Sequence, residues 1–180
     1  MRYRVLAVAL LACACSTRTP PLQDPEAAAN LKAQAAEVGR AMVQEDHGAM
    51  AQLSHPALVD HFGGRAGYIK KIEDMAADLR RQGLKFHAFR FGTPSKMIES
   101  SGDLYAILPC SLELTVPNGE PASQLGYWIC TSRHRGANWK FLDGAGVGGD
   151  RRKLTRLLPR FPEDLPLPES QPLVVPVLPK

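Results

Sequence analysis

The stretch LYAILPCSLELTV, residues 104–116, decides the fold class because its side chains alternate with a period of two. Polar side chains, among them Ser111, Glu113 and Thr115, fill most positions between the apolar ones. This alternation is typical of a β-strand that places one face in a core. The turn-forming run PNGE (117–120) follows, so the strand is expected to open an antiparallel hairpin. The apolar face comprises Leu104, Ala106, Leu108, Cys110, Leu112, Leu114 and Val116.

Further strand-like runs lie on either side of this stretch. LKFHAFRF (84–91) and SKMIES (95–100) precede it, and QLGYWICTS (124–132) and WKFLD (139–143) follow it. Glycine, asparagine, aspartate and serine cluster between several of these runs, as they do in turns between strands. The sequence therefore predicts an antiparallel sheet of about five strands.

Before residue 84, the apolar side chains follow the period of a helix. Asp24-Pro25-Glu26 is a good helix start, with Asp as the N-cap and Pro in the first turn. The helix that begins there is expected to run to about His47. A short second helix is expected to end before Pro56, and ALVDHF (57–62) to add a further turn or two. The stripe of the first helix consists of Leu31, Ala35, Val38 and Met42.

A third helix is expected over residues 66–82, with Gly83 as its C-terminal cap. Its apolar stripe is formed by Tyr68, Ile72, Met75 and Leu79. Helices followed by antiparallel strands predict an α+β fold, in which three N-terminal helices pack on one face of a curved sheet.

The glycines of FLDGAGVGGDRR (141–152) match the pattern G-x-G-x-x-G at positions 144, 146 and 149. A dinucleotide-binding loop also needs a second parallel strand, with an acidic residue about 20 residues further on. Here a short helical run and a proline-rich segment follow instead. We therefore expect no cofactor, and we interpret the glycines as a sharp exit from the last strand that requires positive φ angles.

The first residues, MRYRVLAVALLACACS (1–16), form a basic start, an apolar run and then two cysteines. The apolar run is shorter than the about 20 residues that a membrane-spanning helix needs, and the pattern is that of a secretory signal. It resembles a bacterial lipoprotein signal, which implies that residues 1–14 are a signal peptide cleaved before Cys13 or Cys15. Cys13 has the better leucine three positions upstream, whereas Cys15 allows a longer apolar run, so both stay open. An ordinary secretory signal with incidental cysteines is the alternative.

The lipoprotein resemblance also implies a location. The residue after the lipidated cysteine would be Ala14 or Ser16 and not aspartate. By the sorting rule of such lipoproteins, this implies a lipid-anchored protein of the bacterial cell envelope that faces the periplasm, held in the outer membrane. Residues 15–24 are then a polar, proline-bearing tether between the membrane and the domain.

The folded domain is expected to span residues 25–158 and a proline-rich tail to span 159–180. The tail holds seven of the chain's fifteen prolines, which exclude a regular helix or a central strand. Phe161, Leu165 and Leu167 are expected to pin this extended tail to the domain.

Export affects the interpretation of Cys110 and Cys130, because an oxidising compartment permits disulfides. The two cysteines lie on strand-like runs joined by a turn, which is expected near residues 118–121. Such a turn places them nearly opposite one another, so that a modest local approach would allow a disulfide. The alternative is two buried free thiols, and a one-residue bulge would break the alignment.

The order of these elements resembles the nuclear transport factor 2-like superfamily. HPALVDHFGG (55–64), which precedes the third helix, and WKFLDGAG (139–146), which ends the sheet, carry the resemblance, and it covers roughly residues 26–158. The chain is most similar to exported bacterial members without an assigned activity. The resemblance implies a cone-shaped fold, in which a bent sheet wraps around helices and leaves a pocket between them.

Enzymes of this superfamily use an aspartate base, or a His–Asp pair, in an apolar pocket where a carboxylate gains basicity. The candidates here are Asp60, His61, His87 and Asp143. Asp60 and His61 point about 100° apart on a helix, and Asp143 suits an Asx turn or cap. Alternation alone does not assign the face of His87 to the core. No catalytic motif of the enzymatic members matches residue by residue, which weighs against catalysis.

Metal and nucleic-acid binding gain no support from the sequence. The five histidines and four cysteines lack H-x-x-x-H and C-x-x-C spacing, so no metal site is expected. The formal charge of +4 includes no long basic stripe, so nucleic acid is not an expected partner.

We therefore expect a non-catalytic binding or accessory lipoprotein, anchored to the membrane by its N-terminal lipid, whose partner is an apolar small molecule or an envelope protein. The alternative is an isomerase, cyclase or dehydratase-type enzyme with an Asp or His in its pocket as general acid–base. Five aromatic side chains either line that pocket or belong to an ordinary core: Tyr105, Tyr127, Trp128, Trp139 and Phe141.

Overall fold

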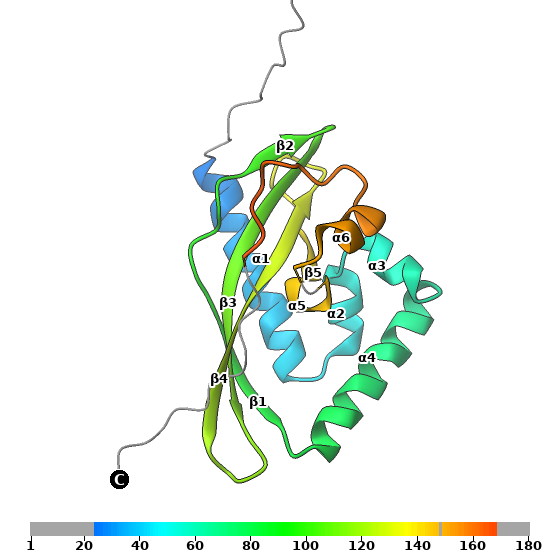
Figure 1. Ribbon diagram of the computed structural model, residues 1–180, viewed down its shortest axis with the longest axis vertical. Coiled ribbons are helices and arrows are strands. Elements are labelled where there is room, and N and C mark those ends of the chain that lie inside the picture. Colours follow the sequence, from blue (N-terminus) through cyan, green and yellow to red (C-terminus); the bar gives the residue numbers. More distant parts are fainter. Residues whose placement is uncertain (1–23, 148, 169–180) are drawn as a thin grey trace, which may run out of the picture.

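The computed structural model describes residues 24–147 and 149–168, and within them helices precede an antiparallel sheet (Figure 1). The expected lipidation sites, the signal peptide and most of the tether lie outside the described residues, as do residues 169–180. The α+β class is confirmed, and the curled sheet is compatible with a cone-like fold. The elements are α1 (Pro25–Val43), α2 (His47–Leu53), α3 (Pro56–His61), α4 (Gly64–Arg81), β1 (Lys85–Phe91), β2 (Ile98–Ser100), β3 (Asp103–Thr115), β4 (Pro121–Ser132), β5 (Lys140–Asp143), α5 (Gly144–Val147) and α6 (Arg151–Leu157).

The sheet is antiparallel throughout, in the order β1–β3–β4–β5, and β2 also pairs with β3. The long hairpin of β3 and β4 forms its centre, as the alternation in residues 104–116 predicts. Within residues 24–147 and 149–168, no helix has the length and apolar character that a bilayer span requires.

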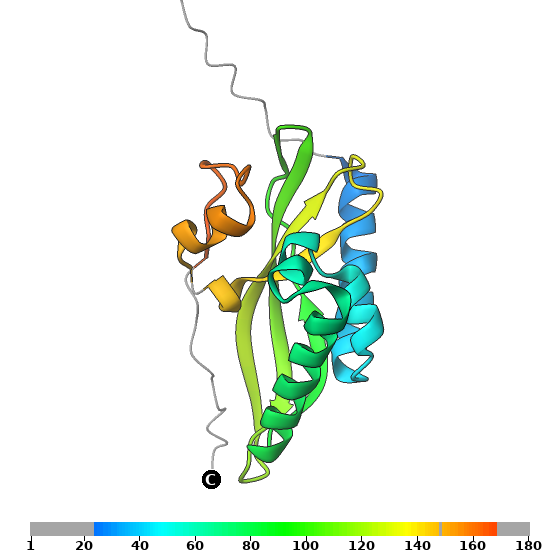
Figure 2. The ribbon, with the colours of Figure 1, turned by 90° about the vertical axis from the view of Figure 1, so that its right-hand side faces the viewer.

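Part of the second face of this sheet is buried as well, although only one covered face was expected. Residues such as Ala106, Leu108 and Cys130 face α1, while their neighbours Ile107 and Ile129 face the opposite way. Figure 2 shows α1 on one side of the sheet and α6, with the segment that follows it, on the other. The second cluster consists of Tyr105, Ile107, Tyr127, Ile129, Leu142, Leu154, Leu158, Phe161 and Leu165. It forms because the intervening positions are apolar as well where β3 passes Ile107 and β4 passes Ile129.

Four helices precede the sheet, where three were expected, because Pro56 begins a separate short helix. Helix α1 packs on β1, whereas α4 packs mainly on α2 and α3. Gly39 allows the close approach of α1, since a Cβ atom there would lie 2.9 Å from the Cβ atom of Phe89. The expected N-cap is present: the Asp24 carboxylate accepts the backbone N–H groups of Glu26 and Ala27.

A β-bulge at His87 changes which side chains of β1 point toward the core. Phe86 pairs with Leu114, but Ala88 pairs with Glu113, so His87 is an extra residue. The bulge brings Phe86 onto the same side as Phe89, where both pack against apolar side chains. His87 lies exposed on the strand. Simple alternation, which groups His87 with Phe89, therefore fails at this point.

The predicted disulfide between Cys110 and Cys130 is wrong, and both residues are free thiols. The hairpin turns around Asn118, so Cys110 pairs with Gly126 and Cys130 pairs with Ala106. The two cysteines are offset by four residues along the strands, which separates their Cα atoms by roughly 10 Å or more. A disulfide needs about 4.4–6.8 Å. Burial raises the pKa of the Cys110 thiol to about 12, with a further contribution from the charge of Asp143.

The glycines that follow β5 have different roles. Gly144 and Gly146 belong to α5, and among the three motif glycines only Gly149 has a positive φ, of 70°. Gly144 is needed for a close approach instead, because a Cβ atom there would lie 2.2 Å from the ring of Tyr127. Within the described residues no strand follows this point, so the second strand that a dinucleotide fold needs is not found there.

Arg151, in the first turn of α6, holds the segment after α6 against the sheet. Its guanidinium donates hydrogen bonds to the carbonyls of Pro162, at 2.9 Å, and Leu165, at 2.6 Å. It also lies over the ring of Phe161, with its central carbon 5.2 Å from the ring centroid. Phe161 and Leu165 are buried and Leu167 packs on the same cluster, which confirms the expectation that these residues pin the tail.

Arg151→Met is therefore expected to lower the free energy of unfolding by about 2 kcal/mol, because two charge-assisted hydrogen bonds are lost. Urea unfolding followed by circular dichroism measures this change. Arg152→Met is the matched control, since the Arg152 side chain is exposed, and a change of no more than about 0.5 kcal/mol is expected there. Equal losses in the two variants would show that Arg151 does not hold the segment.

Candidate functional site

Three of the four expected catalytic candidates lie on the surface. Asp60 and His61 are exposed at the end of α3, and the ring of His61 contacts only the edge of Phe62 among aromatic neighbours. His87 is exposed at the bulge, with its Nε2 atom 2.7 Å from the Thr115 hydroxyl. None of these three side chains lines either of the two larger pockets described below.

Asp143 has a more unusual environment. It ends β5, and its carboxylate accepts the backbone N–H of Ala145 at 3.0 Å, as expected for an Asx turn. The residue keeps contact with solvent, yet desolvation by the surrounding protein raises the pKa of its carboxyl, while hydrogen bonds from the Ala145 and Gly146 backbones oppose the shift. Its charge in turn contributes to raising the pKa of Tyr68 and Tyr127, after burial.

The raised pKa means that the folded protein binds a proton at Asp143 more tightly than the unfolded chain does. The charge therefore costs stability at neutral pH. This cost fades as the pH falls through the raised pKa of the folded protein, and it is gone below the ordinary carboxyl pKa of 3.8. Asp143→Asn keeps the acceptor oxygen and removes the charge. We expect the variant to be more stable than the native protein at pH 7 and equally stable at pH 3, as measured by urea unfolding. A loss of stability at pH 7 would contradict this reading of the carboxylate.

The five aromatic candidates do not line one pocket. Tyr105 and Tyr127 lie on the face covered by the segment after α6. Trp128, Trp139 and Phe141 lie on the opposite face against α1, where the ring centroids of Trp128 and Phe141 are 5.6 Å apart. All five are at most 5% exposed, so they belong to the two cores.

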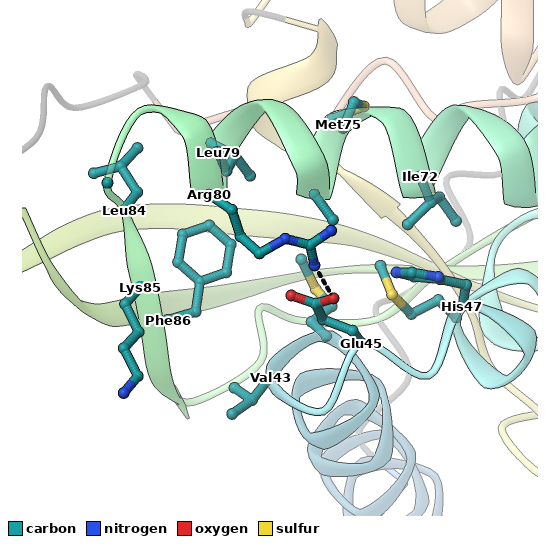
Figure 3. A pocket seen from close by; sticks show the side chains of 14 residues that line it. Val43, Glu45, His47, Ile72, Met75, Leu79, Arg80, Leu84, Lys85 and Phe86 are labelled. Carbon is teal, nitrogen blue, oxygen red and sulfur yellow. Dashed lines mark hydrogen bonds and ion pairs between the residues drawn. The ribbon is translucent and has the colours of Figure 1, made fainter.

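A largely apolar pocket of about 510 Å³ lies elsewhere, between the end of α1, α2, α4 and the start of β1 (Figure 3). It exists because α4 packs on α2 and α3, which leaves part of its apolar stripe facing open space. Ile72 is buried at one end of this stripe, whereas Met75 is 50% exposed. The lining residues are Met42, Val43, Glu45, His47, Met50, Ile72, Met75, Ala76, Leu79, Arg80, Gly83, Leu84, Lys85 and Phe86.

Three methionines give this pocket an adaptable wall. Met42, Met50 and Met75 come from three different helices. Methionine is unbranched and polarizable, so it adjusts to ligands of irregular shape. Leu84 and Phe86, from the start of β1, complete the apolar wall. Such a surface suits an apolar molecule better than a polar one.

A few polar groups lie among these apolar side chains. Glu45 and Arg80 form an ion pair between the α1–α2 turn and α4 (Figure 3). His47 points into the pocket from the start of α2, with its Nδ1 atom 3.8 Å from the Glu73 carboxylate. Its Nε2 atom is buried and has no hydrogen-bond partner among the described residues. A buried polar atom of this kind calls for a partner, and a bound ligand would supply one.

Sequence reasoning named several of these residues but assigned them to the core. Ile72, Met75 and Leu79 follow a helical stripe, and a stripe does not reveal which neighbour covers it. His47 marks the expected end of the first helix and counts among the histidines that lack metal-ligand spacing. The sequence signal that was present is the placement of methionines near the end of α1, in the middle of α2 and within α4. In the described part of the chain, no group of three His, Cys, Asp or Glu side chains is arranged to hold a metal ion.

No protein-family model matches this chain, and no curated protein matches it. The chemistry of the site therefore rests on the residues described above.

Proposed function

We propose that the chain is an envelope-anchored lipoprotein of the nuclear transport factor 2-like superfamily that binds an apolar small molecule without transforming it. The lipoprotein-like start, with Cys13 or Cys15 as the lipid carrier, supports the anchor. The helices that precede a curled antiparallel sheet support the superfamily. The pocket between α1, α2 and α4 supports the binding role.

The observation that carries the proposal is an apolar pocket with one buried, unpartnered imidazole nitrogen, Nε2 of His47. Small-molecule sites combine an apolar lining with a few placed polar groups, and their volumes run from about 300 to 1,000 Å³. The volume of about 510 Å³ falls within this range. The ligand is therefore a mainly apolar molecule with one hydroxyl or carbonyl group, which His47 meets as acceptor or donor according to its tautomer.

A second candidate function is catalysis at Asp143, and a specific observation favours it. The carboxyl group of Asp143 has a raised pKa in the folded protein, which would improve it as a general base. However, Asp143 does not line the apolar pocket. Binding without chemistry is therefore the leading proposal.

The test uses the full chain, purified from its own envelope in detergent, and native mass spectrometry. We expect acyl mass on the N-terminal peptide and a bound small apolar molecule. Ala76 lines the pocket, so Ala76→Phe should fill the space and reduce ligand occupancy at least tenfold. Ala66→Phe is the matched control, because Ala66 is exposed on the same helix and lies outside the pocket.

Equal ligand occupancy in Ala76→Phe and Ala66→Phe would show that the ligand binds outside this pocket, which would contradict the proposal. Conversion of the ligand during incubation, abolished by Asp143→Asn, would establish the enzyme alternative. An N-terminal peptide without acyl mass would contradict the proposed lipid anchor, but it would not affect the proposal that the pocket binds a ligand.

A further inference from the structure

A second pocket, of about 570 Å³, has a different chemical character. It lies between α1, the junction of α2 and α3, the end of β4 and the start of β5. It shares no residue with the apolar pocket, and Asp143 is not among its lining residues. The residues that line it are Gln34, Glu37, Gln52, Leu53, His55, Pro56, Thr131, Arg133, His134, Asn138, Trp139 and Lys140.

Hydrogen-bond donors dominate this polar pocket. The Nδ1 atom of His55 accepts the backbone N–H of Ala57 at 3.1 Å, so the proton of the neutral ring is on Nε2, a donor. Thr131, which is 6% exposed, adds a hydroxyl to the lining. Trp139 is 1% exposed, and its indole N–H has no hydrogen-bond partner among the described residues. A buried donor of this kind is rare unless a ligand or water satisfies it.

The charges of the lining favour an anion. Arg133 and Lys140 carry positive charge, and Glu37 is the one acidic residue of the lining. Arg133 is only loosely engaged, with its Nε atom 3.8 Å from the Asp103 carboxylate and its side chain 75% exposed. The Lys140 ammonium donates to the carbonyl of Gln52, which holds it at the pocket wall.

The same charges act on the imidazole of His55. Burial lowers the pKa of His55, and the charges of Arg133 and Lys140 lower it further, although Asp103 and Asp60 oppose them. His55 is therefore a neutral donor at pH 7. Two cations next to neutral donors form a site that an anionic group would complete.

We propose that this polar pocket binds the carboxylate or phosphate group of a small soluble molecule, with Arg133 and Lys140 as the charged contacts and His55 and Thr131 as neutral contacts. This site is separate from the apolar pocket and does not depend on the function proposed for it. One anionic group is expected rather than a polyanion, because Glu37 offsets one of the two cations.

The experiment titrates the isotopically labelled full chain, in detergent, with inorganic phosphate in one series and acetate in another. Chloride keeps the ionic strength constant, and amide ¹H–¹⁵N spectra report binding. We expect saturable shifts at Thr131, Arg133, Asn138 and Lys140, with a Kd of about 1 mM. Saturation by phosphate alone identifies a phosphate site, saturation by acetate alone a carboxylate site, and saturation by both a general anion site.

The variant Arg133→Gln/Lys140→Gln should weaken binding at least tenfold. The control Arg152→Gln/Lys153→Gln removes the same charge from exposed side chains outside the pocket, and it should bind as the native protein does. Arg133→Gln alone serves as a second variant, because its exposed side chain can be changed without disturbing the fold. The absence of saturable shifts from either anion, or equal binding by the double variant and its control, overturns the proposal.

Discussion

The structure depends on one constraint: the two central strands are apolar on both faces over residues 104–108 and 127–130. Leu108 and Cys130 point to one side, while Ile107 and Ile129 point to the other, and all four are at most 3% exposed. Burial of such side chains stabilises the fold by about 1.5–3 kcal/mol each relative to exposure, so neither face is stable against water. The chain has to cover the sheet twice, and α1 covers one face while α6 and the residues after it cover the other. The segment after α6 is therefore part of the fold and not an appendage.

This double cover explains why the apolar pocket exists. Because α1 packs directly on β1, helix α4 is left to pack mainly on the short helices α2 and α3. Its stripe is longer than the surface they offer, so Ile72 is buried while Met75 stays half exposed. The pocket therefore lies at the margin of the core, where Ile72 is buried and Met75 remains open to a ligand. Binding sites commonly lie in such positions, beside a scaffold that is stable without them.

The sequence predicted what depends on periodicity and missed what depends on single residues. The period of two around Leu108 and the cap at Asp24 are local signals, and both are confirmed. The bulge at His87 is one extra residue without a sequence mark, yet it changes which phenylalanines face the core. The hairpin turn lies only slightly nearer the N-terminus than expected, yet that shift moves Cys110 out of reach of Cys130. Single-residue shifts have such large effects because strand pairing fixes every later contact. The pocket could not be predicted because it reflects how far α4 stands from its neighbours.

Glu45, which lines the apolar pocket, has an unusual backbone conformation. It has a φ of 54°, the left-handed region in which residues other than glycine are disfavoured by about 1–2 kcal/mol. Its carboxylate pairs with Arg80, but both side chains are substantially exposed, and such pairs stabilise by only about 0.2–1 kcal/mol. The ion pair therefore does not offset the cost of the backbone conformation. A glycine at position 45 would make the folded protein at least as stable. What glutamate adds is a carboxylate that fixes Arg80 beside the apolar lining, next to the unpartnered imidazole of His47. A strained backbone position therefore lies at the largely apolar, methionine-lined pocket, in keeping with the binding role proposed above.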